Sequence, residues 1–443
     1  MNSPKDLSTA SLCPRCLRRI EAHLLVREGN VLLEKHCAEH GTTTALLSRH
    51  PDYFLPLRRF YFALNRGSYP QKDFIVHLTD RCNMACPICL AEAGQRHTED
   101  YPTEDLLGFL RGKRGCKIDL MGAEPTTRAD LPELIRRILR SGNLAALHTN
   151  GIRLADPAYC RTLRRAGLRE VHLQFDGFDD RVNRCLRGGD YAAEKVRTLA
   201  NLERLGFSVD LVVTLARGVN EDQIAPILDF AATHPFVKEV FFLGCRFLGR
   251  AKAQALERCL TPDEVIDLVE EHTLGLLERA DLRRFQKLYF TLLSLFKIRK
   301  CFYIQHYLFL RDRGTLVPLA KAFPLAALEP VLDRYRSHVE AGKPQARATL
   351  LLAAARILGK TVTPSLAWEL GSFVLPFARG FDLARLPARP LLIGFISACD
   401  GLIYDEAVAQ NCGKGAISKE LGVQSCGALD NVVRDVVLSG GPR

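Results

Sequence analysis

The stretch that decides the fold is FIVHLTDRCNMACPIC, residues 74–89. Its first half is apolar and rich in β-branched residues, which predicts a buried strand. The strand leads directly into Cys82, Cys86 and Cys89, spaced C-x3-C-x2-C, so we expect the three thiols on one loop at the carboxyl end of the strand. Three thiolates can hold three irons of a [4Fe–4S] cluster and leave the fourth iron open to bind and reduce another molecule. The alternatives are buried free cysteines or half of a zinc site, although a zinc knuckle usually has a second pair nearby and none follows before Cys116.

Composition bounds the class of protein. The chain has 443 residues, 47% of them hydrophobic and 25% charged, which allows two or three domains and excludes wholesale disorder. Residues 1–12 are polar and no uninterrupted apolar run approaches the length of a membrane span, so we expect a cytoplasmic protein. The 15 cysteines then favour metal ligands over disulfides, because the cytosol is reducing. The net charge of +11 favours an anionic partner: a phosphorylated substrate, an acidic membrane surface or nucleic acid.

The first part of the chain, residues 11–60, has the pattern of a small metal-binding module. Cys13 and Cys16 form a C-x2-C knuckle, and Cys37 and His40 form a C-x2-H pair further on, with short β-like segments between them. Four such ligands suit tetrahedral zinc or a mononuclear, rubredoxin-like iron. The alternative is that His40 is an exposed loop histidine and that Cys37 pairs elsewhere. A structural role is expected, because so short a piece has too small a core to fold unaided.

Alternating strand and helix patterns follow from residue 70 to 255. The predicted strands are 74–79, 117–121, 144–149, 170–175, 209–214 and 238–243. A helix is predicted over 158–166 after the cap Asp156 and Pro157, and another begins at Thr261. The pattern predicts an α/β fold, a partial (β/α)6 TIM-like barrel, preceded by the metal-binding module and followed over 256–443 by a mainly helical C-terminal region.

Polar or small residues follow the predicted strands at the edge where their carboxyl ends meet. Each short motif alone is an ordinary turn, but their recurrence in register with the cysteine loop predicts a cofactor site. The candidate cofactor-binding residues are Gly122, Ala123, Glu124, Pro125, Asn150, Gln174, Asp176 and Thr214.

Together these motifs resemble the radical S-adenosylmethionine (radical SAM) superfamily. The resemblance implies that the open iron binds the methionine moiety of SAM, that one electron cleaves the sulfonium to a 5′-deoxyadenosyl radical, and that residues 122–125, Gly-Ala-Glu-Pro here, correspond to a Gly-Gly-Glu-Pro segment that contacts the SAM amino group. CPRC at 13–16, LQFDG at 173–177 and VTLARGVN at 213–220 are similar to a subfamily that contains tetraether lipid synthases and the pterin-methylating enzymes of methanogens.

The C-terminal region carries two further hypotheses. Cys399, Cys412 and Cys426, with Cys245, could bind a second cluster or could be ordinary buried thiols. Residues 283–313 interleave basic and aromatic side chains, which suits either contact with an anionic membrane or core packing with solvated arginines.

The main functional hypothesis is a radical SAM enzyme that abstracts hydrogen from an unactivated carbon of a hydrophobic, anionic substrate such as a lipid, at the membrane periphery. The expected partners are SAM and an electron donor such as flavodoxin or ferredoxin, with no nucleic acid. The alternatives are modification of a peptide or a pterin, or a non-catalytic zinc-ribbon protein that binds nucleic acid. The sequence predicts no catalytic side chain.

Overall fold

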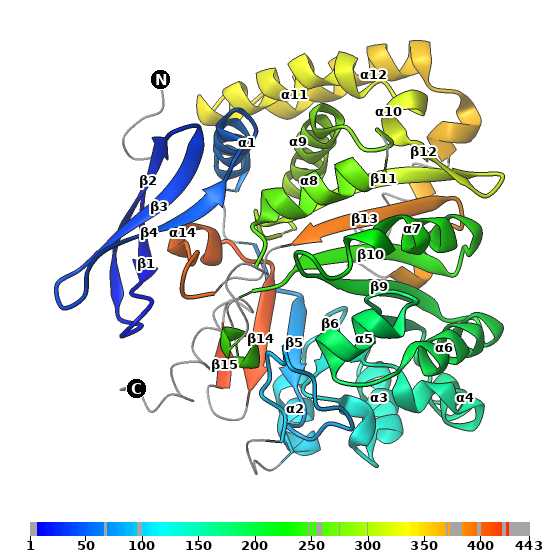
Figure 1. The fold of residues 1–443 in the computed structure, drawn as a ribbon. Helices are drawn as coiled ribbons and strands as arrows, with labels where there is room; N and C mark the ends of the chain where they lie inside the picture. The colour runs from blue at the N-terminus through cyan, green and yellow to red at the C-terminus, as the bar shows by residue number, and fades with distance from the viewer. Residues whose placement is uncertain are drawn as a thin grey trace.

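The computed structural model describes residues 7–65, 69–94, 100–246, 249–253, 259–273, 275–298, 300–368, 371–372, 383–396, 400–418 and 422–424. These residues form a small antiparallel sheet and an 11-stranded sheet, which lie side by side in Figure 1.

The small sheet contains β1 (Ser8–Leu12), β2 (Arg19–Arg27), β3 (Asn30–Cys37) and β4 (Gly41–Ser48), in that order. Its alternating apolar residues, among them Leu24, Val31 and Leu33, are buried. Helix α1 (Pro51–Leu64) follows and contacts β3. The antiparallel ladder brings the β1–β2 turn beside the β3–β4 turn, and these turns carry the predicted metal ligands.

The six predicted strands form the centre of the large sheet. They are β5 (Asp73–His77), β6 (Lys117–Met121), β7 (Leu144–Thr149), β8 (Glu170–Gln174), β9 (Ser208–Leu215) and β10 (Val237–Gly244). Each lies within a residue or two of its predicted range, and each pairs in parallel with the next. The predicted α/β fold with a parallel, partial-barrel sheet is confirmed.

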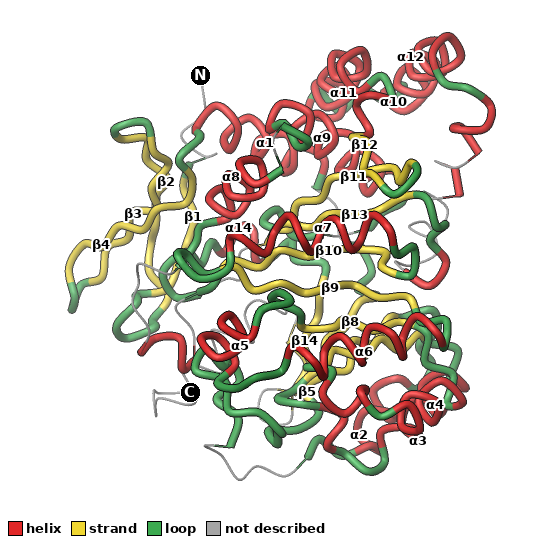
Figure 2. Tube along the Cα trace, turned by 45° about the vertical axis from the view of Figure 1, so that its right-hand side comes forward, coloured by secondary structure: helices red, strands yellow, loops and turns green. Residues whose placement is uncertain are grey.

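Helices join these strands and lie against one face of the sheet, as Figure 2 shows. They are α2 (Thr103–Leu110), α3 (Leu131–Arg140), α4 (Pro157–Arg165), α5 (Asp180–Arg187), α6 (Ala192–Arg204) and α7 (Ile224–Thr233). Helix α4 begins as predicted, because Asp156 accepts a hydrogen bond from the backbone N–H of Ala158 at 2.8 Å. The parallel connections place every carboxyl strand end at one edge.

The C-terminal region supplies five strands that the sequence analysis did not predict. Beyond β10 lie β13 (Pro390–Ile396), which is parallel to it, and then the antiparallel β11 (Ile304–Asp312) and β12 (Thr315–Pro318). Beyond β5 lie the parallel β14 (Lys414–Ser418) and the antiparallel β15 (Gly422–Gln424). The two ends of the sheet are therefore built from segments distant in sequence.

The helix predicted to begin at Thr261 is present as α8 (Pro262–His272). The region is mainly helical as expected, and its other described helices are α9 (Arg279–Leu295), α10 (Leu319–Ala322), α11 (Leu325–Glu340), α12 (Ala346–Thr361) and α14 (Glu406–Ala409). Helix α8 starts with a complete capping box between Thr261 and Glu264. Among the helices that the structure describes, none combines the length and hydropathy needed to cross a membrane.

The basic, aromatic stretch at 283–313 is not a membrane-facing surface, so that hypothesis is wrong. Its aromatic side chains in α9 and β11, such as Phe290 and Tyr307, are buried in the hydrophobic core. Lys287 is only 7% exposed and donates hydrogen bonds to Glu329 at 2.8 Å and Asp333 at 2.9 Å, both on α11. The basic residues thus neutralise acidic residues of a neighbouring helix, and the aromatic residues fill the space between the helices and β11.

Hydrogen bonds join the small sheet to residues 400–409, which we call the closing segment. Thr9 donates to Asp405 at 2.7 Å, Lys35 donates to the Gly401 carbonyl at 2.7 Å, and the guanidinium of Arg58 on α1 donates to Asp405 at 2.8 Å. Arg58 is 4% exposed and Asp405 is fully buried. Asp405 therefore ties together the small sheet, α1 and the start of α14.

Replacing Asp405 with alanine should lower the free energy of unfolding by about 3–5 kcal/mol, because it leaves the Arg58 charge buried without its partner. Urea unfolding followed by circular dichroism would measure the change. The matched control is Glu406→Ala: its partner Arg19 is 69% exposed at the side chain, so the loss should be about 1 kcal/mol or less. Equal effects of the two substitutions would contradict this account.

Candidate active site

The cysteine loop lies over the carboxyl edge of the parallel strands. It is held there by backbone hydrogen bonds from Leu78 N–H to the Met121 carbonyl at 2.8 Å and from Ala123 N–H to the Thr79 carbonyl at 2.8 Å. Cys82, Cys86 and Cys89 line a cavity of about 260 Å³. Its opposite wall and floor come from the ends of β6 to β10, so the cavity joins the three thiols to the interior of the sheet.

The structure brings most of the predicted cofactor-binding residues to this cavity. Gly122, Ala123, Asn150, Gln174 and Thr214 line it. Glu124, Pro125 and Asp176 are buried and are not among its lining residues. Glu124 and Asp176 therefore act on the cavity through the residues that they hold.

Glu124 joins the loops that follow β6 and β7. One carboxylate oxygen accepts a hydrogen bond from the Thr149 hydroxyl at 2.8 Å, and the other accepts from the Asn150 backbone N–H at 2.7 Å. The Asn150 side-chain amide then lies 3.8 Å from the Cys82 sulfur. Burial raises the pKa of Glu124, while these donors favour its charged form. Glu124 is thus a positioning residue for Asn150.

Asp176 is engaged by a residue that sequence reasoning missed. Arg187 at the end of α5 makes two hydrogen bonds to the Asp176 carboxylate, at 2.6 and 3.0 Å, and a third to the Thr214 hydroxyl at 2.9 Å. Arg187 also lines the cavity, as Cys86 does. Although burial opposes the charge, Asp176 holds the pKa of Arg187 above its ordinary value. Nothing in the sequence around Arg187 signals this long-range pair.

Lys195 is a second missed residue. It is fully buried on α6, and its ammonium donates to the Asn150 carbonyl at 2.9 Å and to the backbone and side-chain oxygens of Gln174, both at 2.6 Å. Burial lowers the pKa of Lys195 to about 7. Lys195 therefore fixes the ends of β7 and β8 relative to each other and holds the Gln174 side chain in place.

The loop after β6 requires glycine at position 122 but accommodates alanine at position 123. Gly122 has φ +142°, and a Cβ atom there would lie 2.6 Å from the Thr79 carbonyl oxygen. The close approach of the two loops therefore requires glycine at 122. Ala123 keeps its backbone bond to Thr79 and lines the cavity, so its methyl group is accommodated.

The donor set of the cysteine loop fits a cluster better than a single ion. In the part of the chain that the structure describes, the sulfur atoms of Cys82, Cys86 and Cys89 do not all lie within 4.8 Å of one another. The three thiols therefore line the cavity without converging on one point. Such spacing suits the corners of a polynuclear iron–sulfur cluster. Burial raises the pKa of the Cys82 thiol to about 11, so loading with iron must displace its proton.

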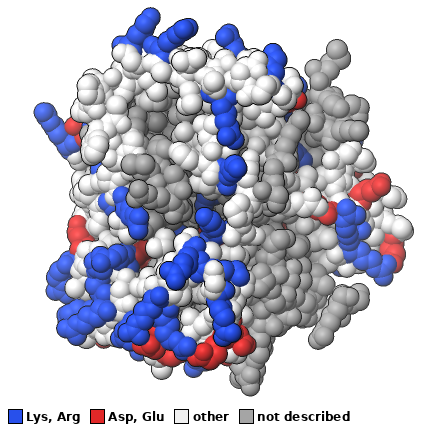
Figure 3. Space-filling model, turned by 180° about the vertical axis from the view of Figure 1, so that it is seen from behind, with Lys and Arg blue, Asp and Glu red and all other residues white. Residues whose placement is uncertain are grey.

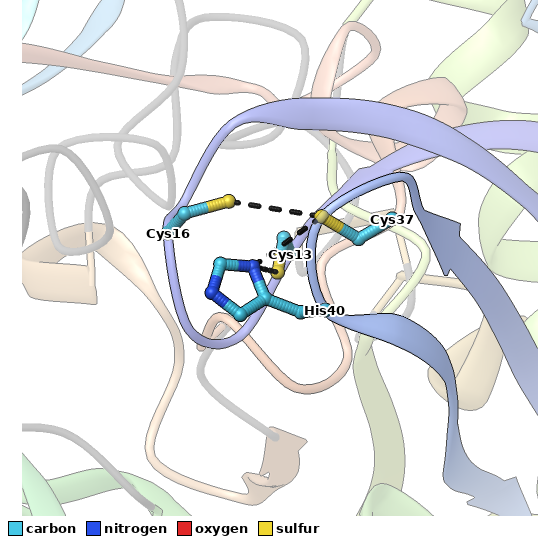
Figure 4. Close-up of side chains that lie close together, drawn as sticks. All are labelled: Cys13, Cys16, Cys37 and His40. Atoms are coloured by element: carbon cyan, nitrogen blue, oxygen red, sulfur yellow. Dashed lines mark hydrogen bonds between the residues drawn. The ribbon is translucent and has the colours of Figure 1, made fainter.

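The N-terminal ligands do converge. Cys13, Cys16, Cys37 and His40 have ligand atoms within 4.8 Å of one another, and Figure 4 shows them facing a common centre. The Cys37 sulfur lies 3.9 Å from the Cys16 sulfur and 3.5 Å from Nδ1 of His40. This is the tetrahedral Cys3His donor set of a structural zinc site.

A row of ionisable residues on the inner face of the sheet was not predicted. His148 and His172 line the cavity floor, and Asp119, Glu170 and Asp210 lie beside them on neighbouring strands. The signal was present in the alternation of KIDLM (117–121) and EVHLQ (170–174), where every second residue is polar or long. In strands flanked by helices, such alternation indicates one face that lines a barrel interior.

The second-cluster hypothesis stays a prediction. Cys245 lines the cavity and is hydrogen-bonded to Cys259, while Cys412 is buried in the main hydrophobic core. Cys399 and Cys426 lie outside the described residues.

A parallel α/β sheet with a three-cysteine loop over its carboxyl edge defines the class of radical SAM proteins. Comparison with known families agrees, since residues 76–231 match the model of the Radical SAM superfamily and residues 7–49 match the HMPTM N-terminal zinc ribbon domain. Residues 76–231 therefore form a radical SAM domain.

Individual relatives match part of the chain. It is 32% identical over 306 residues to the 7,8-dihydro-6-hydroxymethylpterin dimethyltransferase of Methanocaldococcus jannaschii, covering 62% of this chain and 60% of the relative. It is 26% identical over 218 residues to the GTP 3′,8-cyclase of Staphylococcus haemolyticus, covering 46% of this chain and 62% of the relative. Streptococcus suis SuiB bound to its precursor peptide SuiA matches with a TM-score of 0.40 and 17% identity, over 49% of this chain and 50% of that chain. The chain thus spans about 60% of the length of these curated relatives.

Replacing Cys37 with serine should remove one equivalent of zinc and make residues 7–49 sensitive to protease, because the metal supplies folding energy that this small sheet lacks. Elemental analysis and limited proteolysis of the full chain would measure both. Cys185→Ser, outside the four-ligand group, is the control and should keep its zinc. Full zinc content in the Cys37 variant would rule the site out.

Proposed function

We propose that the chain is a radical SAM enzyme whose substrate is a pterin-class nitrogen heterocycle. The observation that carries this proposal is the single cavity that joins the thiols of Cys82, Cys86 and Cys89 to a polar floor on the strand ends. The three cysteines would hold a [4Fe–4S] cluster there, and Asn150 and Thr214 are among the lining residues that would bind SAM. When bound, the cluster supplies the electron that cleaves SAM to a hydrogen-abstracting radical.

The chain's own residues orient the reactants. Glu124 and Lys195 fix Asn150 and Gln174, and Arg187 fixes Asp176 and Thr214. Glu124, Lys195 and Asp176 are fully buried, so the strand ends present their polar groups to the cavity in one arrangement. Rigid placement of this kind is what aligns a radical with one carbon atom of a substrate.

The lipid hypothesis loses one of the observations on which it rested. The basic, aromatic stretch is internal, and an apolar cavity of about 560 Å³ between α9, α11 and α12 shares no lining residue with the cysteine cavity. Figure 3 shows Lys and Arg side chains gathered on the lower part of one face, with acidic side chains beside them. Exposed ion pairs such as Arg137 with Glu104 belong to this kind of mixed surface.

The pterin alternative gains support from the relatives. One relative is named for a pterin and another for GTP, and both molecules contain an aminopyrimidinone fused to a second ring. The cavity offers imidazole, amide and hydroxyl groups among apolar side chains such as Met121 and Val212, a combination that suits a flat ring with polar edges. Membership of a superfamily of enzymes likewise disfavours the non-catalytic, nucleic-acid-binding alternative.

Replacing Cys82, Cys86 or Cys89 with alanine should abolish 5′-deoxyadenosine formation from SAM with dithionite as reductant, because each change removes one of three cluster ligands. Chromatography of the products would measure it. Cys185→Ala is the control and should retain cleavage. Full cleavage by any one of the three variants would overturn the cluster assignment.

The substrate class can be tested on the anaerobically reconstituted enzyme with two probes. We expect 6-hydroxymethyl-7,8-dihydropterin to raise 5′-deoxyadenosine formation above the rate with SAM alone, because a bound substrate consumes the radical productively. Anionic phospholipid vesicles should leave the rate unchanged. Stimulation by vesicles and none by the pterin would return the lipid hypothesis to first place.

A further inference from the structure

Two stacked imidazoles form part of the cavity floor. His148 on β7 and His172 on β8 are opposite each other in the parallel register, with ring centroids 4.1 Å apart and planes 4° from parallel. Both line the cavity, and the His148 side chain is 25% exposed against 9% for His172. The pair therefore presents His148 to a ligand and keeps His172 behind it.

His172 has no nitrogen left for a ligand. Its Nδ1 lies 2.7 Å from a carboxylate oxygen of Asp210, and its Nε2 lies 2.8 Å from one of Glu170. Although burial favours the neutral ring, these two carboxylates raise the pKa of His172 to about 9. His172 is thus a fixed imidazolium at neutral pH.

His148 is different. Its Nε2 is buried with no hydrogen-bond partner among the described residues, and the nearest acceptor is a carboxylate oxygen of Asp119 at 3.7 Å. No described residue hydrogen-bonds to its Nδ1, and the side chain borders the cavity. Burial and the adjacent His172 charge lower the pKa of His148 to about 4, so its ring is neutral and one nitrogen can accept a hydrogen bond.

The stacking geometry argues against a metal ion at this place, although Asp119, His148 and His172 have ligand atoms within 4.8 Å of one another. An imidazole nitrogen directs its lone pair in the plane of the ring, and two stacked, nearly parallel rings with centroids 4.1 Å apart cannot both direct a lone pair at one ion. Both nitrogens of His172 are also already bound to carboxylates. A hydrogen bond to an organic ligand is the use that this arrangement permits.

The side-chain amide of Gln174, which also lines the cavity, already makes its hydrogen bonds within the protein. Its side-chain oxygen accepts from Lys195 and its nitrogen donates to Asp176, both at 2.6 Å. This leaves His148 as the imidazole with hydrogen-bonding capacity directed at the cavity.

We propose that His148 is a substrate-binding residue, which accepts a hydrogen bond from a ring N–H of a planar nitrogen heterocycle seated on the cavity floor. The assignment rests on the proposed function, since it takes the cavity as the substrate site. A ring N–H satisfies the imidazole nitrogen, whereas an alkyl chain would leave it unpaired at a cost in binding. The His172 charge beneath also favours an electron-rich or anionic ring over a cationic one.

The charges around His148 make this binding depend on pH in a defined way. They come from Lys117 and Asp119 on β6, Glu170 and His172 on β8, Asp210 on β9, and Lys414 on β14, which donates to Asp119. His172→Gln removes the nearest positive charge, so the pKa of His148 should rise. The variant should then bind the heterocycle well above that pKa and lose affinity as the pH falls through it, whereas the wild type, in which the pKa of His148 is about 4, should not show this loss in the same pH range.

The test is equilibrium binding of 6-hydroxymethylpterin to the holoenzyme, followed by the fluorescence of the pterin. His148→Phe keeps a planar ring but has no nitrogen, and it should weaken binding about tenfold, the loss of one hydrogen bond. His148→Asn, whose side-chain oxygen stands near the position of Nδ1, should recover part of the affinity. His23→Phe, on an exposed site of β2, is the control and should bind as the wild type does.

The outcomes separate the two proposals. If the wild type binds the pterin and His148→Phe binds it equally well, with unchanged iron content and circular dichroism, the role of His148 is overturned and the proposed function stands. If the wild type does not bind the pterin, the substrate class and the role of His148 fall together. A pH response in His172→Gln that matches the wild type would also contradict the assignment.

Discussion

Register between neighbouring parallel strands is the constraint on which the site depends. His148 lies opposite His172, and His172 lies opposite Asp210, so three strands place three ionisable side chains in one row. Because side chains alternate across a sheet, a slip of one residue would move a whole strand's set to the face that packs against the helices. There the charges would be buried against apolar residues such as Leu147 and Val171 without partners. The register that builds the cavity floor is therefore also the one that avoids this cost.

Charge compensation inside the sheet makes this interior tolerable. Lys117 donates to Glu170 beside it, and Lys414 donates to both Asp119 and Asp73. Despite burial, Lys117 and His172 lower the pKa of Glu170 to about 2, so it stays ionised. Against the effect of burial, Lys414 and Lys117 likewise hold the pKa of Asp119 below its ordinary value. His148 is neutral, whereas the stacked His172 is charged, so only His148 can accept a hydrogen bond from a ligand.

Local patterns in the sequence predicted the elements whose information is local. The β-branched strand and spaced cysteines of 74–89, the cap at Asp156 and the capping box at Thr261 each appear in the structure as expected. Arg187, Lys195 and the strands β11 to β15 were missed because their partners lie far away in the sequence. The alternation of polar residues in β6 and β8 is visible in the sequence, but the prediction uses it only to place the strands and not to identify the face that lines the cavity. The basic stretch in α9 suggested a surface, because Glu329 and Asp333, which neutralise it, lie on another helix.

The zinc ribbon is connected to the cavity through the closing segment. Thr9 and Lys35 bind Asp405 and the Gly401 carbonyl, and Arg246, which lines the cavity, binds Asp400 in the same segment at 2.7 Å. The chain then enters β14, which pairs in parallel with β5, the strand that leads into the cysteine loop. From β14, Lys414 reaches Asp119, the carboxylate nearest to Nε2 of His148. The small sheet therefore holds in place the segment that leads to Lys414, the residue that neutralises Asp119 next to His148. In this way the N-terminal metal site, although remote from the cavity, stabilises residues that surround it.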